Sequence, residues 1–395
     1  MSKTIRLFDE NSHLYNFDAT VLSCEAIAAP RAFTVVLDAT AFFPEGGGQG
    51  ADRGTLDGLT VTDVQESGGV ITHTVCADSL PFTVGQTIHG ELDRALRHER
   101  MQCHTGEHIV SGIIHRRFGY RNVGFHLGDD DVTLDFDGVL DRAALDEIED
   151  EANRAVAACL PVRAWYPDPE ELAGLPYRAK LDLTENVRIV EIGEGGSIDR
   201  CACCAPHVAN TGEIGMIKLL DFIHYKGGVR IHMHCGVRAL ADYRRRYTAV
   251  ATMAAAMSVK QDEVTAGFDR LQGELEEKKQ TISSLRGRLE VLMTDAISPT
   301  EGSLCLFDSD LEPIEMRRLL NRAVEKCGRF CGVFVGDDER GYRYVIGRGT
   351  PELDLRAYVK DINAALSARG GGSSEMLQGS STATRAEIEA FFEGL

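Results

Sequence analysis

The sequence lacks any long apolar run. It contains no stretch of about eighteen consecutive apolar residues, and its first residues, MSKTIRLFDENSH, include no apolar core. A membrane-spanning helix needs about 20 mostly apolar residues, and a secretory signal peptide needs an apolar core of about 7 to 15. We therefore expect a cytoplasmic protein with no membrane partner.

Basic residues are also scarce. The chain carries 42 Lys and Arg against 61 Asp and Glu, a formal net charge of -19. Proteins that bind nucleic acid without sequence preference usually carry a basic footprint. The balance argues against general nucleic-acid affinity, but it leaves room for a local basic groove, and basic residues cluster at 94–101, 115–121 and 244–247.

A disulfide framework is missing as well. The cysteines number eleven, an odd count, and they are spread along the chain with one cluster beside a histidine. In a reducing compartment this pattern favours metal binding or buried thiols. We interpret the isolated cysteines as core residues: Cys24, Cys76, Cys159, Cys305, Cys327 and Cys331.

The chain of 395 residues is longer than a single core usually extends, and we predict an α+β fold in four parts. Residues 1–90 contain period-2 runs such as FTVVLDAT and GVITHTV, which predict a small antiparallel β-barrel interrupted by a glycine-rich loop. Residues 91–236 predict an α+β domain. Residues 237–296 predict a helical hairpin or coiled-coil connector, and residues 297–395 a C-terminal α/β domain.

The apolar residues of the connector follow a heptad repeat. Their spacings are 4, 3, 4, 7, 3, 4 and 3, with one apolar member missing at Lys278; the positions are Val264, Phe268, Leu271, Leu275, Ile282, Leu285, Leu289 and Leu292. A repeat of about four heptads indicates a coiled coil or a helical hairpin. A single amphipathic helix packed on its own domain is the alternative. We also consider a homodimer formed through this connector or through the C-terminal domain.

The C-terminal part includes RGGGSSEMLQGSS at 369–381. Its glycine and serine content favours a flexible turn over a binding loop.

Two pairs of candidate metal ligands stand out. HTGEH places His104 and His108 four residues apart in the strongest helical stretch, so that both imidazoles project from one helix face. RCACCAPHV contains Cys203 and His207, also four residues apart. Three imidazole nitrogens and one thiolate suit a tetrahedral Zn²⁺.

Two alternatives stay open at this point. Cys201 and Cys204 form a C-x-x-C, which suits half of a zinc knuckle or a redox pair. Glu107 completes H-x-x-E-H, the inverted zinc-peptidase pattern in which the glutamate is the general base. That pattern needs a further ligand, such as a carboxylate from EIEDE (147–151), and would leave the pair Cys203 and His207 without a use, so we rank it second. On the helix, Glu107 lies beside the second histidine and flanks the metal face.

Four motifs occur in order over residues 3–236: FFPEGGGQGADRG, HTGEHIVSG, NVGFHLG and CCAPHVANTGEIG. Together they resemble the stand-alone alanyl-tRNA editing proteins (the AlaX family), which are related to the editing domain of alanyl-tRNA synthetase. The helical connector and the glycine-rich segment 369–381 resemble the long form of this family, whose C-terminal domain is of the DHH-associated type. No DHH phosphoesterase motif accompanies them, so the resemblance implies no nuclease activity.

The resemblance implies one Zn²⁺ per chain, because an H-x-x-x-H and a C-x-x-x-H bind one zinc in this family. Carried over by register, the ligands are His104, His108, Cys203 and His207. The chain has Cys204, Ala205 and Pro206 where the family has Gly-Gly-Thr, which leaves Cys201 or Cys204 as an alternative ligand.

The implied activity is that of an aminoacyl-tRNA deacylase, a carboxylic ester hydrolase that removes serine, and secondarily glycine, from mischarged alanine tRNA. Such an activity has a physical reason, because a pocket built for alanine cannot strongly reject a smaller residue or one that adds only a hydroxyl. The alternative is a catalytically idle, zinc-organised tRNA-binding protein.

The motifs also suggest the remaining site residues. The catalytic candidates are Glu107, Gln49 and His126, and the substrate-binding candidates are Gly46, Gly47, Gly48, Gly124 and Phe125. Thr211 and Glu213 are candidates to support His207 from behind.

Overall fold

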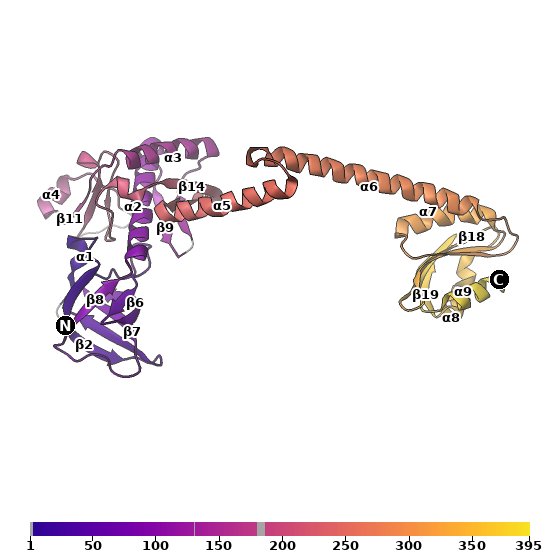
Figure 1. The fold of residues 1–395 in the computed structure, drawn as a ribbon, viewed down its shortest axis with the longest axis horizontal. Helices are drawn as coiled ribbons and strands as arrows, with labels where there is room; N and C mark the ends of the chain where they lie inside the picture. Colours follow the sequence, from indigo (N-terminus) through magenta and orange to yellow (C-terminus); the bar gives the residue numbers. More distant parts are fainter. Residues whose placement is uncertain (1–2, 130, 180–185) are drawn as a thin grey trace. The chain divides into compact units, whose positions relative to one another are not determined.

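The computed structural model describes residues 3–129, 131–179 and 186–395. The chain divides into two compact units, Met1–Thr252 and Met253–Leu395 (Figure 1). Helices and several β-sheets are mixed in the fold, which confirms the predicted α+β class. The finer division into four parts remains a proposal.

No helix in the described part of the chain has both the length and the apolar composition that crossing a lipid bilayer requires.

A closed β-barrel lies at the start of the first unit. Its strands follow the order β2-β3-β7-β6-β5-β8. They are β2 (Asn16–Ala26), β3 (Ala32–Leu37), β5 (Gly54–Leu56), β6 (Leu59–Ser67), β7 (Val70–Cys76) and β8 (Thr87–Leu92). Every second residue of β8 is buried, as expected for a strand with one face on the core. Beside the barrel, β1 (Ile5–Arg6) leads into α1 (Leu7–Glu10) and pairs in parallel with β4 (Ala39–Thr40).

The long helix α2 (Arg94–Phe118) is central to the rest of this unit. Asp93 caps its N-terminus by accepting a hydrogen bond from the Leu96 N–H, and Gly119 ends it in the left-handed conformation (φ 73°). Most of the helix is buried. It contacts α3 (Arg142–Ala157), a four-stranded sheet and a three-stranded sheet.

The four-stranded sheet has the order β14-β15-β10-β9, and the three-stranded sheet the order β11-β12-β13. Their strands are β9 (Asn122–Leu127), β10 (Val132–Phe136), β14 (Ile217–Tyr225), β15 (Gly228–Cys235), β11 (Val162–Trp165), β12 (Ile189–Ile192) and β13 (Asp199–Ala202). The short helix α4 (Pro169–Gly174) follows β11, and α5 (Gly236–Met257) follows β15.

The second unit contains a long helix and a mixed sheet. The sheet has the order β16-β17-β18-β20-β19, and only the β16–β17 pair is parallel. Its elements are α6 (Val264–Asp295), β16 (Leu304–Asp308), α7 (Pro313–Ala323), β17 (Phe330–Asp337), β18 (Gly341–Arg348), α8 (Val359–Ala365), β19 (Ala368–Gly372), β20 (Met376–Ser381) and α9 (Arg385–Glu393).

The preference for a flexible turn at 369–381 is wrong, because most of this segment forms the hairpin β19–β20. Pairing with β18 supplies long-range backbone hydrogen bonds that composition does not reveal. The glycines serve close packing here. A Cβ on Gly370 would lie 2.1 Å from the hydroxyl of Tyr344, and one on Gly379 would lie 2.4 Å from the Arg369 carbonyl oxygen.

The interpretation of the isolated cysteines as core residues is only partly right. Cys327 and Cys331 are buried, and Cys24 and Cys305 are half-buried, whereas Cys76 and Cys159 are exposed. Cys76 is the last residue of β7, and Cys159 adopts a positive φ (49°) just after α3. Both residues lie where a strand or helix ends, so they are exposed although their neighbours in the sequence are apolar.

Candidate metal centre

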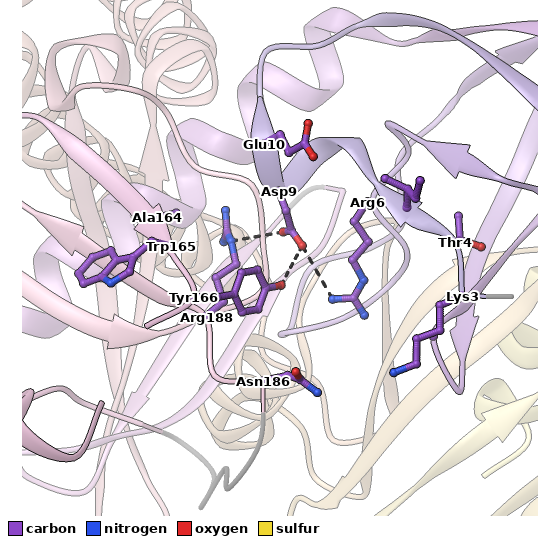
Figure 2. Close-up of a pocket in the computed structure, with 12 residues that line it drawn as sticks. Lys3, Thr4, Arg6, Asp9, Glu10, Ala164, Trp165, Tyr166, Asn186 and Arg188 are labelled. Atoms are coloured by element: carbon purple, nitrogen blue, oxygen red, sulfur yellow. Dashed lines mark hydrogen bonds and ion pairs between the residues drawn. The ribbon is translucent and has the colours of Figure 1, made fainter. Parts of the chain in front are cut away.

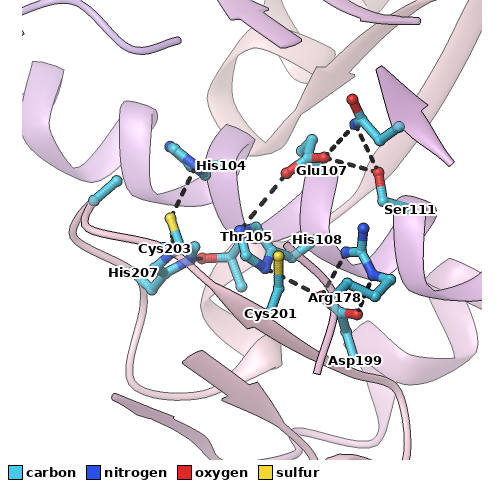
Figure 3. A network of polar contacts seen from close by, with 12 residues as sticks. His104, Thr105, Glu107, His108, Ser111, Arg178, Asp199, Cys201, Cys203 and His207 are labelled. Atoms are coloured by element: carbon cyan, nitrogen blue, oxygen red, sulfur yellow. Dashed lines mark hydrogen bonds and ion pairs between the residues drawn. The ribbon is translucent and has the colours of Figure 1, made fainter. Parts of the chain in front are cut away.

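The four predicted ligands come together in the first unit. The ligand atoms of His104, His108, Cys203 and His207 all lie within 4.8 Å of one another. The first two residues are on α2, and the other two are in the loop after β13 (Figure 3). The Cys203 Sγ lies 3.5 Å from His104 Nε2 and 3.4 Å from His207 Nε2.

This geometry fits a tetrahedral zinc ion. With Zn–N bonds of about 2.0–2.1 Å and a Zn–S bond of about 2.3 Å, a tetrahedral ion holds nitrogen and sulfur ligands about 3.5 Å apart. The two sulfur–nitrogen distances agree with this value. Three imidazoles and one thiol are also ligand types that zinc accepts.

Each imidazole of the cluster is held by a polar partner at Nδ1. The pairs are His104 with Gln49 Oε1 (2.9 Å), His108 with Asp199 Oδ2 (3.1 Å) and His207 with Thr105 Oγ1 (3.0 Å). An amide oxygen and a carboxylate can only accept, so Nδ1 carries the proton in the first two pairs. The Nε2 lone pairs of these rings are then available to a metal.

Asp199 places a negative charge behind His108. Arg178 donates to it from Nε (2.7 Å to Oδ1) and from Nη2 (2.8 Å to Oδ2). Burial by itself raises the pKa of Asp199, but the hydrogen bonds from His108 and Arg178 bring that pKa below its usual range. The carboxylate is therefore ionised at neutral pH and makes the imidazole a stronger ligand.

Asp199 and Thr105 were not predicted as partners of the ligands, and the predicted partners of His207, which are Thr211 and Glu213, are wrong. Thr211 donates its hydroxyl to the Ala155 carbonyl oxygen (2.6 Å). Glu213 Oε1 accepts from the backbone N–H groups of residues 209 and 210, at the start of a 3₁₀ turn. One signal was available, since Thr105 precedes His108 by three positions and so lies on the same face of the helix.

Burial sets the protonation of the cluster when no cation is bound. It raises the pKa of the Cys203 thiol, with a further contribution from Cys204. It also lowers the pKa of His207, helped by His108 and His104. Both shifts favour neutral groups. Because a metal takes the thiolate, binding at this cluster releases a proton.

The ligand loop is fixed through its backbone. Arg188 donates from Nη1 to the carbonyl oxygens of Cys203 (3.2 Å) and Ala205 (2.9 Å). Ser12 donates its hydroxyl to the His207 carbonyl oxygen (2.7 Å). Two segments distant in the sequence therefore hold the loop against α2.

The two alternative thiols differ in position. Among the described residues, Cys204 belongs to no cluster of potential metal ligands, and it is exposed. Cys201 is buried and groups with His108 and Asp199 instead. The two cysteines of the C-x-x-C therefore do not share a cluster.

The glycine-rich loop is anchored next to the first ligand. Phe43 N–H donates to Asp52 Oδ2 (2.7 Å), and Asp52 N–H donates to the Phe43 carbonyl oxygen (3.0 Å), which closes the base of the loop. Arg97 of α2 donates from Nε to the same carboxylate (2.9 Å). At the tip, Gly48 has φ 83°, and a Cβ there would lie 2.5 Å from the Phe125 carbonyl oxygen. Only glycine allows this approach to β9.

The cluster opens on a cavity of 440 Å³. Its lining includes ligands of the cluster, the loop, β9 and two arginines: Gly47, Gly48, His104, His108, Phe125, Cys203, Arg6 and Arg188. A second cavity of 490 Å³ shares Arg6, Tyr166, Asn186 and Arg188 with the first (Figure 2). Asp9 ties this shared region together by accepting from the Tyr166 hydroxyl (2.8 Å) and pairing with Arg188 (3.3 Å).

Other predicted site residues lie away from this cavity. Glu107 is buried, accepts from Ser111 Oγ (2.7 Å) and Asn122 Nδ2 (2.6 Å), and lies 3.7 Å from His108 Nε2. His126 is exposed and lines a separate cavity of 700 Å³ together with Gly46 and Gln49. Gly124 lies against the side chain of Asp135.

The third ligand that an inverted zinc peptidase would need is also engaged elsewhere. Glu147 pairs with Arg117, and Glu151 with Arg116. Glu149 binds Lys218 (2.7 Å). None of these carboxylates joins the four-ligand cluster.

Two family models of tRNA synthetases match parts of the chain. Residues 9–96 match the family model described as class II (A) tRNA synthetases. Residues 187–233, which include both ligands of the loop, match the second additional domain of threonyl and alanyl tRNA synthetases. The chain thus shares two regions with tRNA synthetases.

A more particular similarity extends over nearly the whole chain. The alanyl-tRNA editing protein AlaX-L of Pyrococcus horikoshii is 25% identical over 397 residues, which cover 97% of this chain and 96% of that protein. The alanine–tRNA ligase of Ignicoccus hospitalis is 30% identical over 80% of this chain, but this chain spans only 36% of that ligase. The resemblance to long-form alanyl-tRNA editing proteins is therefore confirmed.

Among solved structures, the C-Ala domain of Aquifex aeolicus alanyl-tRNA synthetase covers 25% of this chain at 16% identity and a TM-score of 0.21.

Proposed function

We propose that this chain is a trans-editing hydrolase that cleaves the ester between a wrong amino acid and alanine tRNA, with serine as the main substrate and glycine as a second one. The observation that carries the proposal is the four-ligand cluster, which opens on a cavity beside the glycine-rich loop. Similarity to AlaX-L along the chain supports the choice of substrate.

We further propose that one Zn²⁺ is bound by His104, His108, Cys203 and His207. When bound, the ion supplies a positive charge beside the ester, which orients and polarises the substrate. With all four of these side chains bound, no open position would remain for an attacking water, and the site would serve to anchor and orient the substrate.

The residues around the cluster perform the binding. Arg6 and Arg188, which line both cavities, supply positive charge for the phosphates of the tRNA 3′ end. Phe125 and Tyr166 offer ring faces on which a terminal base can stack. Gly47 and Gly48 let the backbone of the loop come close to the aminoacyl group.

The three catalytic candidates take different roles in this proposal. Gln49 is a positioning residue, because it holds the ring of His104. Glu107 is proposed to act from beside the ion, because its carboxylate lies 3.7 Å from His108 Nε2, the nitrogen that would face the metal, and it does not line the cavity. His126 is proposed to contact the tRNA outside the aminoacyl pocket, from the neighbouring cavity.

The test is deacylation of preloaded tRNA. Alanine tRNA charged with serine, glycine or alanine is incubated with the zinc-loaded protein, and loss of the aminoacyl ester is followed over time. We expect the seryl ester to be lost fastest and the alanyl ester to persist. The Cys203→Ala variant should no longer deacylate the seryl ester, whereas the Cys204→Ala variant should still do so.

One outcome would favour the idle tRNA-binding alternative. If the loaded protein binds the tRNA while all three esters decay at the uncatalysed rate, the hydrolytic proposal is wrong.

We also propose that the chain is cytoplasmic and that the C-terminal unit is a DHH-associated type domain that contributes to tRNA binding.

A further inference from the structure

A second group of potential metal ligands lies in the first unit and shares no residue with the four-ligand cluster. The ligand atoms of His13, His98 and Glu213 all lie within 4.8 Å of one another, and the three residues are half-buried. His98 is on α2, His13 lies in the segment between α1 and β2, and Glu213 is in the 3₁₀ turn Thr211–Ile214. Segments far apart in the sequence therefore bring two imidazoles and one carboxylate together.

The two oxygens of the Glu213 carboxylate have different partners. Oε1 accepts from the backbone N–H groups of Ala209 (3.0 Å) and Asn210 (3.1 Å), which fixes the side chain in place. Oε2 lies 2.7 Å from His13 Nε2. One oxygen therefore serves the backbone, and the other is directed at the histidine.

The neighbouring Ser12 determines where His13 carries its proton. The Ser12 hydroxyl donates to the His207 carbonyl oxygen (2.7 Å), so it can only accept from His13 Nδ1, which lies 3.2 Å away. Nδ1 therefore carries a proton, and Nε2 faces a carboxylate oxygen that can only accept. A positive charge must lie between Nε2 and this oxygen, and either a second proton or a metal cation can supply it.

His98 completes the ligand set from α2. Within the part of the chain that the structure describes, no hydrogen bond engages its ring, so its nitrogens are available to a cation. Two imidazoles and one carboxylate are a set that Zn²⁺ accepts with water in the fourth position. Mg²⁺ and Ca²⁺ prefer sites made of oxygen ligands, so this set favours a cation of the zinc type.

We propose that His13, His98 and Glu213 bind a second, exchangeable Zn²⁺, which clamps the ligand loop of the first cluster. Both segments that meet His98 already hold this loop. Ser12, next to His13, donates to the His207 carbonyl oxygen, and Glu213 accepts from the two residues that follow Val208. A cation that joins these segments to α2 stabilises the loop in its docked position.

The second site binds zinc more weakly than the four-ligand cluster. It offers three ligands and no thiolate, and the side chains of His13 and Glu213 are 31% and 24% exposed. Arg94, which lies over the Tyr15 ring beside His13, adds a positive charge nearby. The contact of 2.7 Å between His13 and Glu213 is that of a hydrogen bond, whereas nitrogen and oxygen ligands of one tetrahedral zinc lie about 3.3 Å apart. Zinc must therefore displace a proton and separate the two side chains, so dialysis removes it from this site first.

The first experiment counts cations by calorimetry. Dialysed protein is titrated with Zn²⁺, and the wild type should bind one further zinc per chain, whereas His98→Ala should lose this event. His115→Ala is the matched control, because His115 is an exposed histidine on the same helix and joins no ligand cluster among the described residues. It should still bind the further zinc. No further binding in the wild type, or the same binding in His98→Ala, would overturn the proposal.

The second experiment uses Co²⁺ in place of zinc to tell the two sites apart. Cobalt bound by a thiolate gives an ultraviolet charge-transfer band, so the first equivalent of Co²⁺ should produce this band through Cys203. The second equivalent should change only the visible bands, because its ligands include no sulfur, and His98→Ala should lose that change alone. A second equivalent that strengthens the thiolate band would place the ion at another cysteine and contradict the proposal.

The third experiment tests the clamp by amide hydrogen exchange over residues 208–214. Protein that already holds the first zinc is compared with and without further Zn²⁺. The added zinc should slow exchange in this segment of the wild type but not in His98→Ala. Equal exchange in the wild type under both conditions would show that the cation does not hold the loop. None of the three measurements uses hydrolytic activity, so each result stands apart from the proposed function.

Discussion

Replacing Asp199 by asparagine tests whether the cluster is a metal centre in which this carboxylate orients the ligand His108. The substitution keeps the shape of the side chain and removes its charge. Arg178 and His108 both donate to the carboxylate, and an amide has only one oxygen, so at least one donor would meet an NH₂ group. The imidazole of His108 would then be a weaker and less firmly oriented ligand.

The expected magnitude follows from this geometry. Loss of an outer partner of a metal-binding histidine reduces metal affinity by about 10- to 100-fold, which corresponds to about 1.4 to 2.7 kcal/mol. Asp199 is buried and ionised and serves two donors. We therefore expect Asp199→Asn to fall in the upper half of this range.

The assay is competition for Zn²⁺ against a fluorescent chelator. Glu191→Gln is a matched control, because Glu191 forms a similar part-buried pair with Arg200 across β12 and β13 without touching a ligand. It should leave the zinc affinity unchanged. Wild-type affinity in Asp199→Asn would refute the reasoning about this residue, and wild-type affinity in Cys203→Ala would refute the metal centre itself.

Three further predictions concern the same unit. Metal analysis after dialysis should find one zinc per chain in the wild type and in Cys204→Ala but none in Cys203→Ala; a reversed result would make Cys204 the ligand. Gly48→Ala should lower stability towards urea by at least about 1–2 kcal/mol, because its φ is positive and β9 is too close, whereas Gly46→Ala should be nearly neutral; equal effects would contradict the close approach. Burial lowers the pKa of His73 from 6.5 to about 4, so the unfolded chain binds the proton more readily. The contribution of neutral His73 to the free energy of unfolding is fully present above pH 6.5. It falls by up to about 3 kcal/mol as the pH drops towards 4. His73→Gln should flatten this slope in urea unfolding between pH 4 and 7, and an unchanged slope would count against it.

The local parts of the site could be predicted from the sequence. The helical spacing of His104 and His108 and the equal spacing of Cys203 and His207 depend only on neighbours in the chain, and the cluster contains all four. The helix start at Asp93 and the glycine stop at Gly119 are likewise local signals.

The supporting residues could not be predicted, because they come from distant segments. Gln49 stands 55 positions from His104, and Asp199 stands 91 positions from His108. Without knowledge of which strands meet α2, no spacing rule connects them. The hairpin at 368–381 escaped notice for the same reason, since its strand character depends on pairing with β18.

The wide separation of the ligands along the chain has a consequence for biosynthesis. His104 and Cys203 are 99 positions apart, so a nascent polypeptide that ends before the loop after β13 offers only the two imidazoles of α2. At about 5 to 20 residues per second, some seconds of elongation separate the emergence of the two halves. If the cluster binds zinc as proposed, full coordination would wait until the loop has emerged and docked, and zinc content would be a readout of completed translation and folding.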